Sequence, residues 1–569
     1  MAASIHRLLI LVLVCFWSVV SHALLAQYTL SGKAQDTKNG KPIPFVNVWI
    51  TGSTYGTSTN IDGDFELKIS TKWIGKGHTI SLSSIGFNSQ QLSLDQLDLA
   101  IYQVINLEPS ATSLLEVVIR GKRKKKEVKQ ARLLVSKALS KIPRNYVAQP
   151  YLANTFYRHY CSENDEYVRL IEAALDIYSP RNNFEYRTLP DERLAFKVTQ
   201  LRRSFDFTES AKVYHPSISI NYLLSNDFTS FDYHNPLKSE LDDYDFYISD
   251  TTYLDQEPVI RVQFEPNQGP QETGERSYSG TLFIMEKDLT FIRAEIEEVK
   301  NKRLSMDSIY SATAKIVTFK EYQKKYYLDR VTSDLRVYHA AFDSLARIVD
   351  TLVHKSHVEL IANNMELDKI ERFKGKEPQK NDLLRIKYDS AFWSSYTILK
   401  ESELEAKIIA DLSDKVSLDQ QFKAFNTIES GGTSILETPR FKEILSAFKG
   451  TPLYLVIWSR GDYINHIELE PLPYFKRMIR KEKAKILLIS IDESEEDWQE
   501  SRKYLGLNKA QLVHRRIGMG FEEEVTKKYF RNVLPYYLVV DKEGQLYKEP
   551  PLPYEDQIKP VLQSLIKKR

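Results

Sequence analysis

The spacing of hydrophobic positions divides the chain into regions of different character. Between residues 27 and 109, short alternating runs are separated by Asn39-Gly40 and Asp62-Gly63, pairs that favour tight turns. This pattern predicts a small antiparallel β-sandwich. From Tyr151 onward the runs are longer, richer in aromatic and β-branched residues, and alternate with a period of two. We expect a large antiparallel sheet there, with a half-barrel as one form it can take.

The last part of the chain has a different pattern. Leu453–Trp458 and Lys485–Ile491 are continuously apolar, as strands are when both faces of their sheet are covered. Ser494, with Asp497 three residues later, is typical of a helix start. Tyr536–Gly544 predicts a further strand and turn. The fold class that follows is multidomain and β-rich, with an α/β domain at the end.

The changes of pattern also suggest domain boundaries. Helical spacing occurs over 131–142, where Pro143 should end the helix, and again over 400–428. We divide the chain into a leader (1–26), a β-sandwich (27–109), a basic linker (110–130), a β-rich middle domain (131–385), a helical connector and linker (386–449) and a C-terminal α/β domain (450–569).

The first 26 residues have the features of a secretory signal peptide. A basic start precedes an apolar run from Leu8 to Val20, which is too short to span a membrane, and small residues follow. Cleavage after Ala23 or after Ala26 fits the pattern. We therefore expect an exported protein.

Composition narrows the classes of function. The 569 residues carry a formal net charge of +2, which gives no general case for nucleic-acid binding. The chain has two cysteines, and Cys15 lies in the expected leader, so the mature chain would keep only Cys161 and no internal disulfide. It contains no Walker A loop, no G-x-S-x-G motif and no zinc-spaced His/Glu set. We predict no catalytic residue, cofactor or metal.

Four segments of the N-terminal region resemble the carboxypeptidase regulatory-like (transthyretin-like) domain: SGKAQD, KPIPFVNVWI, GTSTNIDGDFEL and SLSSIGF. That domain opens many exported proteins of Gram-negative envelopes. The resemblance implies a β-sandwich, and a location in the periplasm or on the periplasmic face of the outer membrane. A zinc carboxypeptidase needs His-x-x-Glu, which none of the 11 histidines begins. His354 and His357 should point to opposite faces of an expected strand. Residues 27–109 are thus expected to form a binding or spacer domain, not a peptidase.

The most basic stretch is RGKRKKKEVK, residues 120–129. One interpretation is a solvated linker that leads into a helix. The other is contact with anionic lipid headgroups or an acidic polymer. The contacting residues would then be Arg120, Lys122, Arg123, Lys124, Lys125 and Lys126. No aromatic residue interleaves the run, so stacking on nucleic-acid bases is not supported.

The segment FYRHYC places His159 and Cys161 on one face of an expected strand. A nucleophile–base pair is conceivable, but such a pair needs a third group that orients the base. We therefore expect ordinary packing here.

The C-terminal region resembles the thioredoxin-like disulfide reductases of the bacterial envelope. The resemblance rests on the strand Leu453–Trp458, on the turn and helix pattern after it, and on Pro535, which matches the family's cis-proline. The family has Cys-x-x-Cys where this chain has Asp462 and Asn465, and neither residue can form a mixed disulfide. The resemblance implies a thioredoxin-like fold without its redox chemistry.

These observations favour a non-catalytic binding or scaffold protein of the cell envelope, whose partner is another envelope protein or a peptide. In the resembling family the cis-proline loop pairs with extended peptides by strand addition. The implied contacts are Trp458, Asp462, Asn465, Leu534 and Pro535. The competing interpretation is that these residues only complete a stable fold. Two alternatives stay open for the middle domain: a hydrolase with an unrecognised site, and a carrier of an apolar ligand.

Overall fold

The computed structural model describes most of the chain after the expected leader. The described residues are 27–110, 125–180, 195–205, 207, 223–224, 241–267, 276–300, 308–342, 348–368, 370–373, 386–397, 399–414, 416–424, 426, 439–458, 484–492, 494–504, 513–517, 536–545, 560–561 and 563–564. Within these ranges, no helix combines the length and the apolar character needed to cross a membrane. The expected signal peptide, 1–26, lies outside them.

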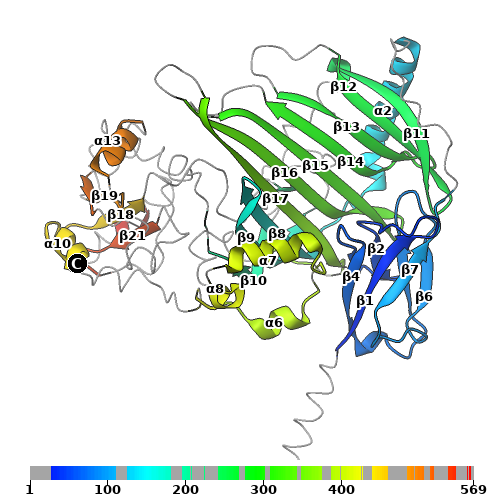
Figure 1. Ribbon diagram of the computed structural model, residues 1–569, viewed down its shortest axis with the longest axis horizontal. Helices are drawn as coiled ribbons and strands as arrows, with labels where there is room; N and C mark the ends of the chain where they lie inside the picture. Colours follow the sequence, from blue (N-terminus) through cyan, green and yellow to red (C-terminus); the bar gives the residue numbers. More distant parts are fainter. Residues whose placement is uncertain are drawn as a thin grey trace, which may run out of the picture.

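Two small sheets form the N-terminal domain, seen in blue in Figure 1. One has the order β4-β1-β7 and the other β3-β2-β5-β6. The strands are β1 (Gln27–Asp36), β2 (Asn47–Ile50), β3 (Gly56–Ser58), β4 (Asp64–Ser70), β5 (Thr79–Ser83), β6 (Gln90–Ser93) and β7 (Gln103–Leu107). Alternate residues such as Val48 and Leu67 are fully buried between the sheets. Gly63 adopts the positive φ of 77° that the predicted turn before β4 requires, which supports the sandwich prediction.

The middle of the chain forms one ten-stranded antiparallel sheet with β10 and β11 as its end strands (Figure 1). Its order is β10-β9-β8-β17-β16-β15-β14-β13-β12-β11. The strands are β8 (Tyr151–Glu163), β9 (Glu166–Ser179), β10 (Ala195–Arg203), β11 (Tyr244–Leu254), β12 (Glu257–Pro266), β13 (Arg276–Met285), β14 (Phe291–Lys300), β15 (Ser308–Tyr322), β16 (Lys325–Phe342) and β17 (Ile348–Glu366). The last strand, β17, pairs with the first, β8, so distant parts of the sequence become neighbours.

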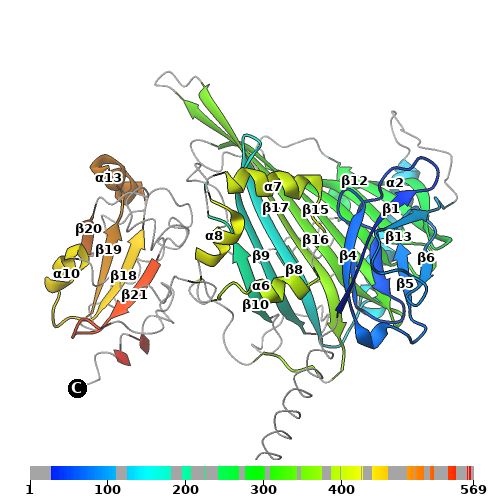
Figure 2. The same ribbon diagram turned by 60° about the horizontal axis from the view of Figure 1, so that its bottom comes forward.

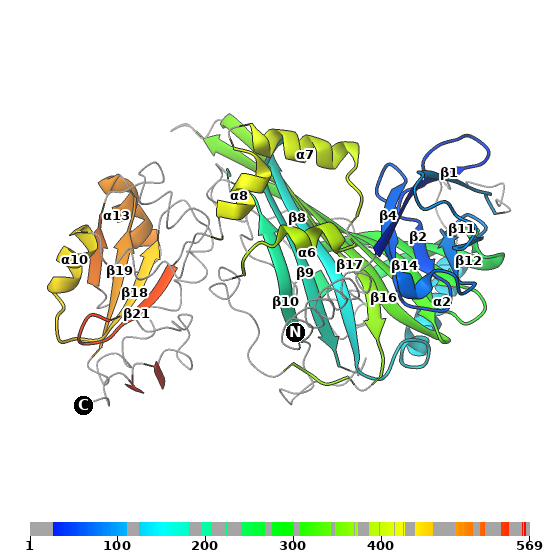
Figure 3. The same cartoon turned by 90° about the horizontal axis from the view of Figure 1, so that it is seen from below.

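Helices cover both faces of this large sheet. One face packs against α2 (Lys125–Asn145), whose buried residues include Val135 and Ile142. The other face carries α6 (Ser390–Ser395), α7 (Glu403–Ser413) and α8 (Leu418–Ala424), which lie over β8, β9 and β10 in Figures 2 and 3. Ile408 of α7 and Phe422 of α8 share a buried cluster with Leu170 of β9.

The first helix differs from its prediction at both ends. It begins at Lys125, so the last six residues of the expected linker, 125–130, are helical. It also continues through Pro143 to Asn145. Tertiary contacts hold the turn that contains the proline: Asn145 Nδ2 donates to Thr290 Oγ1 at 2.7 Å, and the Tyr146 hydroxyl donates to the Phe291 carbonyl at 2.6 Å. A proline in the last turn costs one helical hydrogen bond, which these contacts offset.

The sandwich is bonded to the large sheet at two places. At one, the Thr54 hydroxyl donates to the Met365 carbonyl at 2.9 Å, at the end of β17. At the other, Gly86 N–H donates to the Tyr253 carbonyl at 2.8 Å, near the β11–β12 turn. The Arg330 guanidinium also lies 4.0 Å from the centre of the Phe45 ring. These contacts fix the sandwich against the sheet.

The C-terminal domain is a mixed four-stranded sheet with the order β20-β19-β18-β21. β18 (Leu453–Trp458), β19 (Lys485–Ser490) and β20 (Val513–Arg516) are parallel, and β21 (Tyr536–Val540) runs antiparallel to β18. The described residues of this region also include the helices α10 (Pro439–Ser446) and α13 (Glu495–Tyr504). All residues of β18 are buried, as its continuous apolar sequence predicts. The predicted fold class is confirmed: a β-rich chain with a sandwich, a large antiparallel sheet and an α/β domain.

Candidate functional site

The first candidate site is the edge of the C-terminal sheet at Trp458. This residue ends β18, is fully buried, and its indole Nε1 has no hydrogen-bond partner among the described residues. Tyr536, the first residue of β21, pairs with Ile457, so β21 begins at the edge where β18 ends. Asp462, Asn465, Leu534 and Pro535, the other expected contacts, lie outside the described residues.

Polar side chains gather at the carboxyl end of the neighbouring strands. Ser490 pairs with Trp458 across the sheet, and its hydroxyl donates to Asp492 Oδ2 at 2.7 Å. Arg516, at the end of β20, forms an ion pair with Glu495 at 2.8 Å. In open α/β sheets, ligands bind at the carboxyl ends of the parallel strands. This edge is therefore the place where the C-terminal domain would meet a ligand.

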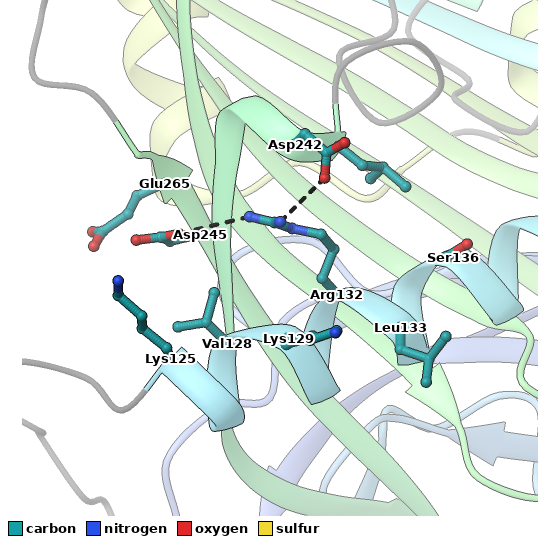
Figure 4. Close-up of a pocket in the computed structure, with 10 residues that line it drawn as sticks. Lys125, Val128, Lys129, Arg132, Leu133, Ser136, Asp242, Asp245 and Glu265 are labelled. Carbon is teal, nitrogen blue, oxygen red and sulfur yellow. Dashed lines mark hydrogen bonds and ion pairs between the residues drawn. The ribbon is translucent and has the colours of Figure 1, made fainter.

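The second candidate site is the start of α2. Lys125 and Lys126 are exposed, whereas Arg120, Lys122, Arg123 and Lys124 lie outside the described residues. An open crevice of about 1010 Å³ lies between α2 and the start of β11. Figure 4 shows the residues that line it.

Acidic side chains line the opposite wall of this crevice. Arg132 donates to Asp242 at 3.1 Å and lies 3.8 Å from Asp245, and the Lys125 side chain extends toward Glu265 and Asp245 (Figure 4). Arg132 lies outside the basic run 120–129, so its ion pairs leave both interpretations of that run open.

The third candidate site is a cluster of polar side chains around Cys161. Some of its members are far apart in the sequence and could not be predicted from local spacing. Cys161 lies on β8, where it pairs with Arg169 of β9 and Ser356 of β17. Arg169 Nη2 donates to Cys161 Sγ at 3.1 Å, and His159 Nε2 lies 3.4 Å from the same sulfur. Ser356 Oγ is 3.0 Å from His159 Nε2. Cys161 and His159 are both completely buried.

A second histidine completes the Cys161 cluster. His354 of β17 lies against Cys161 with its Nδ1 3.3 Å from Glu163 Oε1. This carboxylate orients His354, whereas His159, the base considered in the sequence analysis, has no partner at Nδ1 among the described residues. The pair was missed because His354 and Glu163 are 191 residues apart. His357, three residues later, instead stacks on Tyr160 with ring centres 4.8 Å apart, as expected for the opposite face of the strand.

The electrostatics of the Cys161 cluster favour a charged sulfur. Burial alone would raise the pKa of the Cys161 thiol, but Arg169 and the two histidines outweigh it and hold that pKa well below its usual range. Burial lowers the pKa of His159, and contact with Arg169 contributes to that shift. Burial alone would lower the pKa of His354, but the proximity of Cys161 and Glu163 outweighs it and raises that pKa.

The opposite face of the same strand carries a buried network of ion pairs. Arg158 Nε donates to Glu172 at 2.8 Å and its Nη1 donates to Glu405 of α7 at 2.6 Å. Glu172 also pairs with Arg202 at 2.5 Å, and Arg330 pairs with Glu359 at 2.8 Å. Each of these ion pairs joins two elements, and the bond to Glu405 holds α7 on the sheet. We therefore assign the network a structural role.

Among the residues described, no cluster of three or more His, Cys, Asp or Glu side chains is arranged to hold a metal ion. The described residues thus belong to a multidomain protein with an N-terminal β-sandwich, a ten-stranded antiparallel sheet and a C-terminal α/β domain, and the sequence contains no Cys-x-x-Cys motif.

Parts of the chain are similar to known proteins. Residues 30–119 match the model of the CarboxypepD_reg-like domain. No curated protein matches the chain.

Several solved structures resemble part of the chain. One is the C-terminal domain of a putative thiol-disulfide oxidoreductase from Bacteroides thetaiotaomicron, with 20% identity, a TM-score of 0.19, and coverage of 22% of this chain and 82% of that one. A thioredoxin domain from Bacteroides vulgatus gives 20% identity, the same TM-score, and coverage of 22% and 84%. The exposed lipoprotein thioredoxin Etrx1 of Streptococcus pneumoniae gives 24% identity, a TM-score of 0.18, and coverage of 21% and 90%. These matches transfer no activity to this chain.

Proposed function

We propose that the protein is a non-catalytic binding or scaffold protein of the bacterial cell envelope, in which the C-terminal domain recognises an extended peptide or a partner protein. One observation carries this proposal. The sheet that ends at Trp458 has no cysteine at the positions expected of a reductase, and Cys161 is completely buried in a different sheet. Disulfide exchange needs an accessible thiolate and a second thiol. The domain therefore offers a surface, not a reaction.

The proposed mode of recognition is the pairing of an extended peptide beside Trp458. The edge formed by the end of β18 and the start of β21 includes a buried tryptophan with an unpaired donor among the described residues. In the resembling family an extended peptide pairs with the main chain of the cis-proline loop, here Leu534 and Pro535, so affinity would arise without a catalytic group. Trp458, Asp462, Asn465, Leu534 and Pro535 are the proposed contacts.

The matching experiment measures binding of the full chain to an array of extended peptides, beside the variants Asp462→Arg and Pro535→Ala. Glu443→Arg serves as the control, because Glu443 is exposed on α10 and the substitution makes the same change of charge as Asp462→Arg. We expect both test variants to lose peptides that the parent and the control retain. Equal binding by all four chains would make this domain structural and would refute the proposal.

The location is proposed together with the function. An exported chain with a regulatory-like sandwich belongs in the periplasm or on the periplasmic face of the outer membrane. Fractionation of cells that produce the chain, with mass determination of its N-terminus, tests this. Recovery from the cytoplasm with residues 1–26 intact would contradict it.

The two alternatives gain little from the structure. A hydrolase in the middle domain would need a reactive group within reach of a large substrate, and the Cys161 sulfur, the best candidate, is fully buried. A carrier would need space on the apolar face of the sheet, where the side chains of α2 instead share one packed core with the strands.

A further inference from the structure

The Cys161 cluster is a site that the proposed binding function does not use. It combines a sulfur atom with a cation in direct contact, two histidines and a carboxylate, all buried between three strands. Clusters of this kind are unusual in a packed sheet, because each polar group must be desolvated. We therefore asked which chemistry its geometry supports.

The first observation is the contact between Arg169 and the sulfur. Arg169 Nη2 lies 3.1 Å from Cys161 Sγ, and a guanidinium remains charged at any pH the protein meets. A cation at this distance favours the thiolate, which is the reactive form of cysteine. His354, oriented by Glu163, lies against the same sulfur and is positioned to give or take a proton there.

The second observation concerns two nitrogen atoms. His159 Nδ1 and His354 Nε2 have no hydrogen-bond partner among the described residues, although the two side chains are 0% and 1% exposed. A buried polar atom without a partner costs about 1–3 kcal/mol. Such atoms mark places where a small polar molecule can complete the hydrogen bonding. His159 faces the sulfur with its other nitrogen, Nε2, so His354, which lies against Cys161, is the ring on which a bound molecule would lie beside the sulfur.

We propose that Cys161 is a site of oxidation by small hydroperoxides, which convert it to the sulfenic acid. The thiolate attacks the distal peroxide oxygen, the sulfur–oxygen bond forms and the oxygen–oxygen bond breaks. The departing alkoxide or hydroxide takes a proton from the His354 imidazolium and leaves as alcohol or water. The sulfur is oxidised by two electrons and the peroxide is reduced by two. No second thiol is needed.

Burial sets the size of the oxidant. Because the sulfur and both imidazoles are sealed from solvent, a protein disulfide or a bulky peroxide has no route to them, whereas hydrogen peroxide is not much larger than water. The site would therefore respond to small oxidants, and the product would be protected from other thiols.

In the test, the full chain is exposed to hydrogen peroxide and the reaction is stopped with catalase. The chain is then unfolded in urea that contains dimedone, which labels sulfenic acid, and iodoacetamide, which labels free thiol. Peptide mapping then gives the free and oxidised fractions of Cys161, separately from Cys15. At pH 6 we expect native Cys161 to react at least about ten-fold faster than the same residue in urea, where an ordinary thiol is largely protonated. The native rate should change little between pH 6 and 8, whereas the unfolded rate should rise about ten-fold per pH unit.

Variants separate the role of Arg169 from that of folding. Arg169→Gln should lower the native rate about ten-fold or more, and Arg169→Lys should retain part of it because a cation remains. Arg293→Gln is the control, an arginine of β14 in the same sheet that pairs with Glu295 instead. Circular dichroism establishes whether each variant is folded, and the comparison of native with unfolded parent needs no variant.

Two results would overturn the proposal. One is a native rate below that of the unfolded chain throughout the pH range, which describes an inert core thiol. The other is a native rate that rises with pH as steeply as the unfolded rate, which describes an ordinary thiol. Cumene hydroperoxide should react far more slowly than hydrogen peroxide with the native chain, and equal rates would refute the sealed site.

Discussion

The two principal sheets of this protein divide between them the features that a disulfide reductase combines. The C-terminal sheet has the strand arrangement expected of the thioredoxin-like fold, but Asp462 and Asn465 stand where the cysteines would be. The ten-stranded sheet has a thiol, Cys161, whose sulfur lies 3.1 Å from Arg169 Nη2, but it does not have that strand arrangement. A strand arrangement shared with an enzyme therefore does not supply the side chains on which that enzyme's activity depends.

The largest loss of stability should come from a substitution in the buried ion-pair network of the ten-stranded sheet. Arg158→Ala leaves Glu172 and Glu359 buried without this partner, and loss of one member of a buried ion pair costs about 3–5 kcal/mol. Chemical denaturation should show that the transition of the large sheet shifts while that of the C-terminal domain stays. Arg293→Ala, at a partly exposed pair, should change stability by less than about 1 kcal/mol.

The reciprocal change removes the core of the C-terminal sheet. Trp458→Ala deletes a fully buried indole, which should destabilise that domain by about 3–5 kcal/mol. Hydrogen exchange should then rise in β18, β19 and β21 and remain unchanged in β8 and β17. Equal loss of protection in both sheets would contradict their independence.

A smaller effect should come from acid, which should destabilise the ten-stranded sheet through protonation of Glu172. Burial tends to raise the pKa of Glu172, but Arg202 and Arg158 outweigh it and lower that pKa below 4.5. The stabilisation is thus complete above pH 4.5 and is lost as the pH falls through the lower, folded-state pKa. Glu172→Gln should cost about 1–3 kcal/mol at pH 7, and the difference from the parent should shrink below pH 4.5. A difference that is constant with pH would show that the Glu172 charge has no role.

The smallest effect should come from the exposed start of α2. Replacing Lys125 and Lys126 by Gln should leave the free energy of unfolding within about 0.5 kcal/mol of the parent. If the basic run contacts anionic surfaces, vesicle binding should weaken by about 1 kcal/mol per lysine. Co-sedimentation with phosphatidylglycerol vesicles measures this, and unchanged binding would leave only the solvated interpretation.

Much of the fold followed from local pattern, because burial on one or both faces imposes a period that the sequence displays. Leu453–Trp458 and the turn at Gly63 are as predicted. The course of α2 through Pro143 was not, because contacts from Thr290 and Phe291 hold that turn. Half of the Cys161 cluster was visible, since His159 and Cys161 share a face. The other half depends on the pairing of β8 with β17, a long-range register that no local pattern records.

We propose that the C-terminal domain has no disulfide-reductase activity, because Asp462 and Asn465 stand where the family has its cysteines. The most direct test is an insulin disulfide-reduction assay of the parent chain, of Cys161→Ser, and of a double variant with cysteine in place of both Asp462 and Asn465. We predict background rates for the first two and a measurable gain for the double variant. A parental rate above background that Cys161→Ser abolishes would contradict this proposal, because it would show that the parent chain reduces disulfides through Cys161.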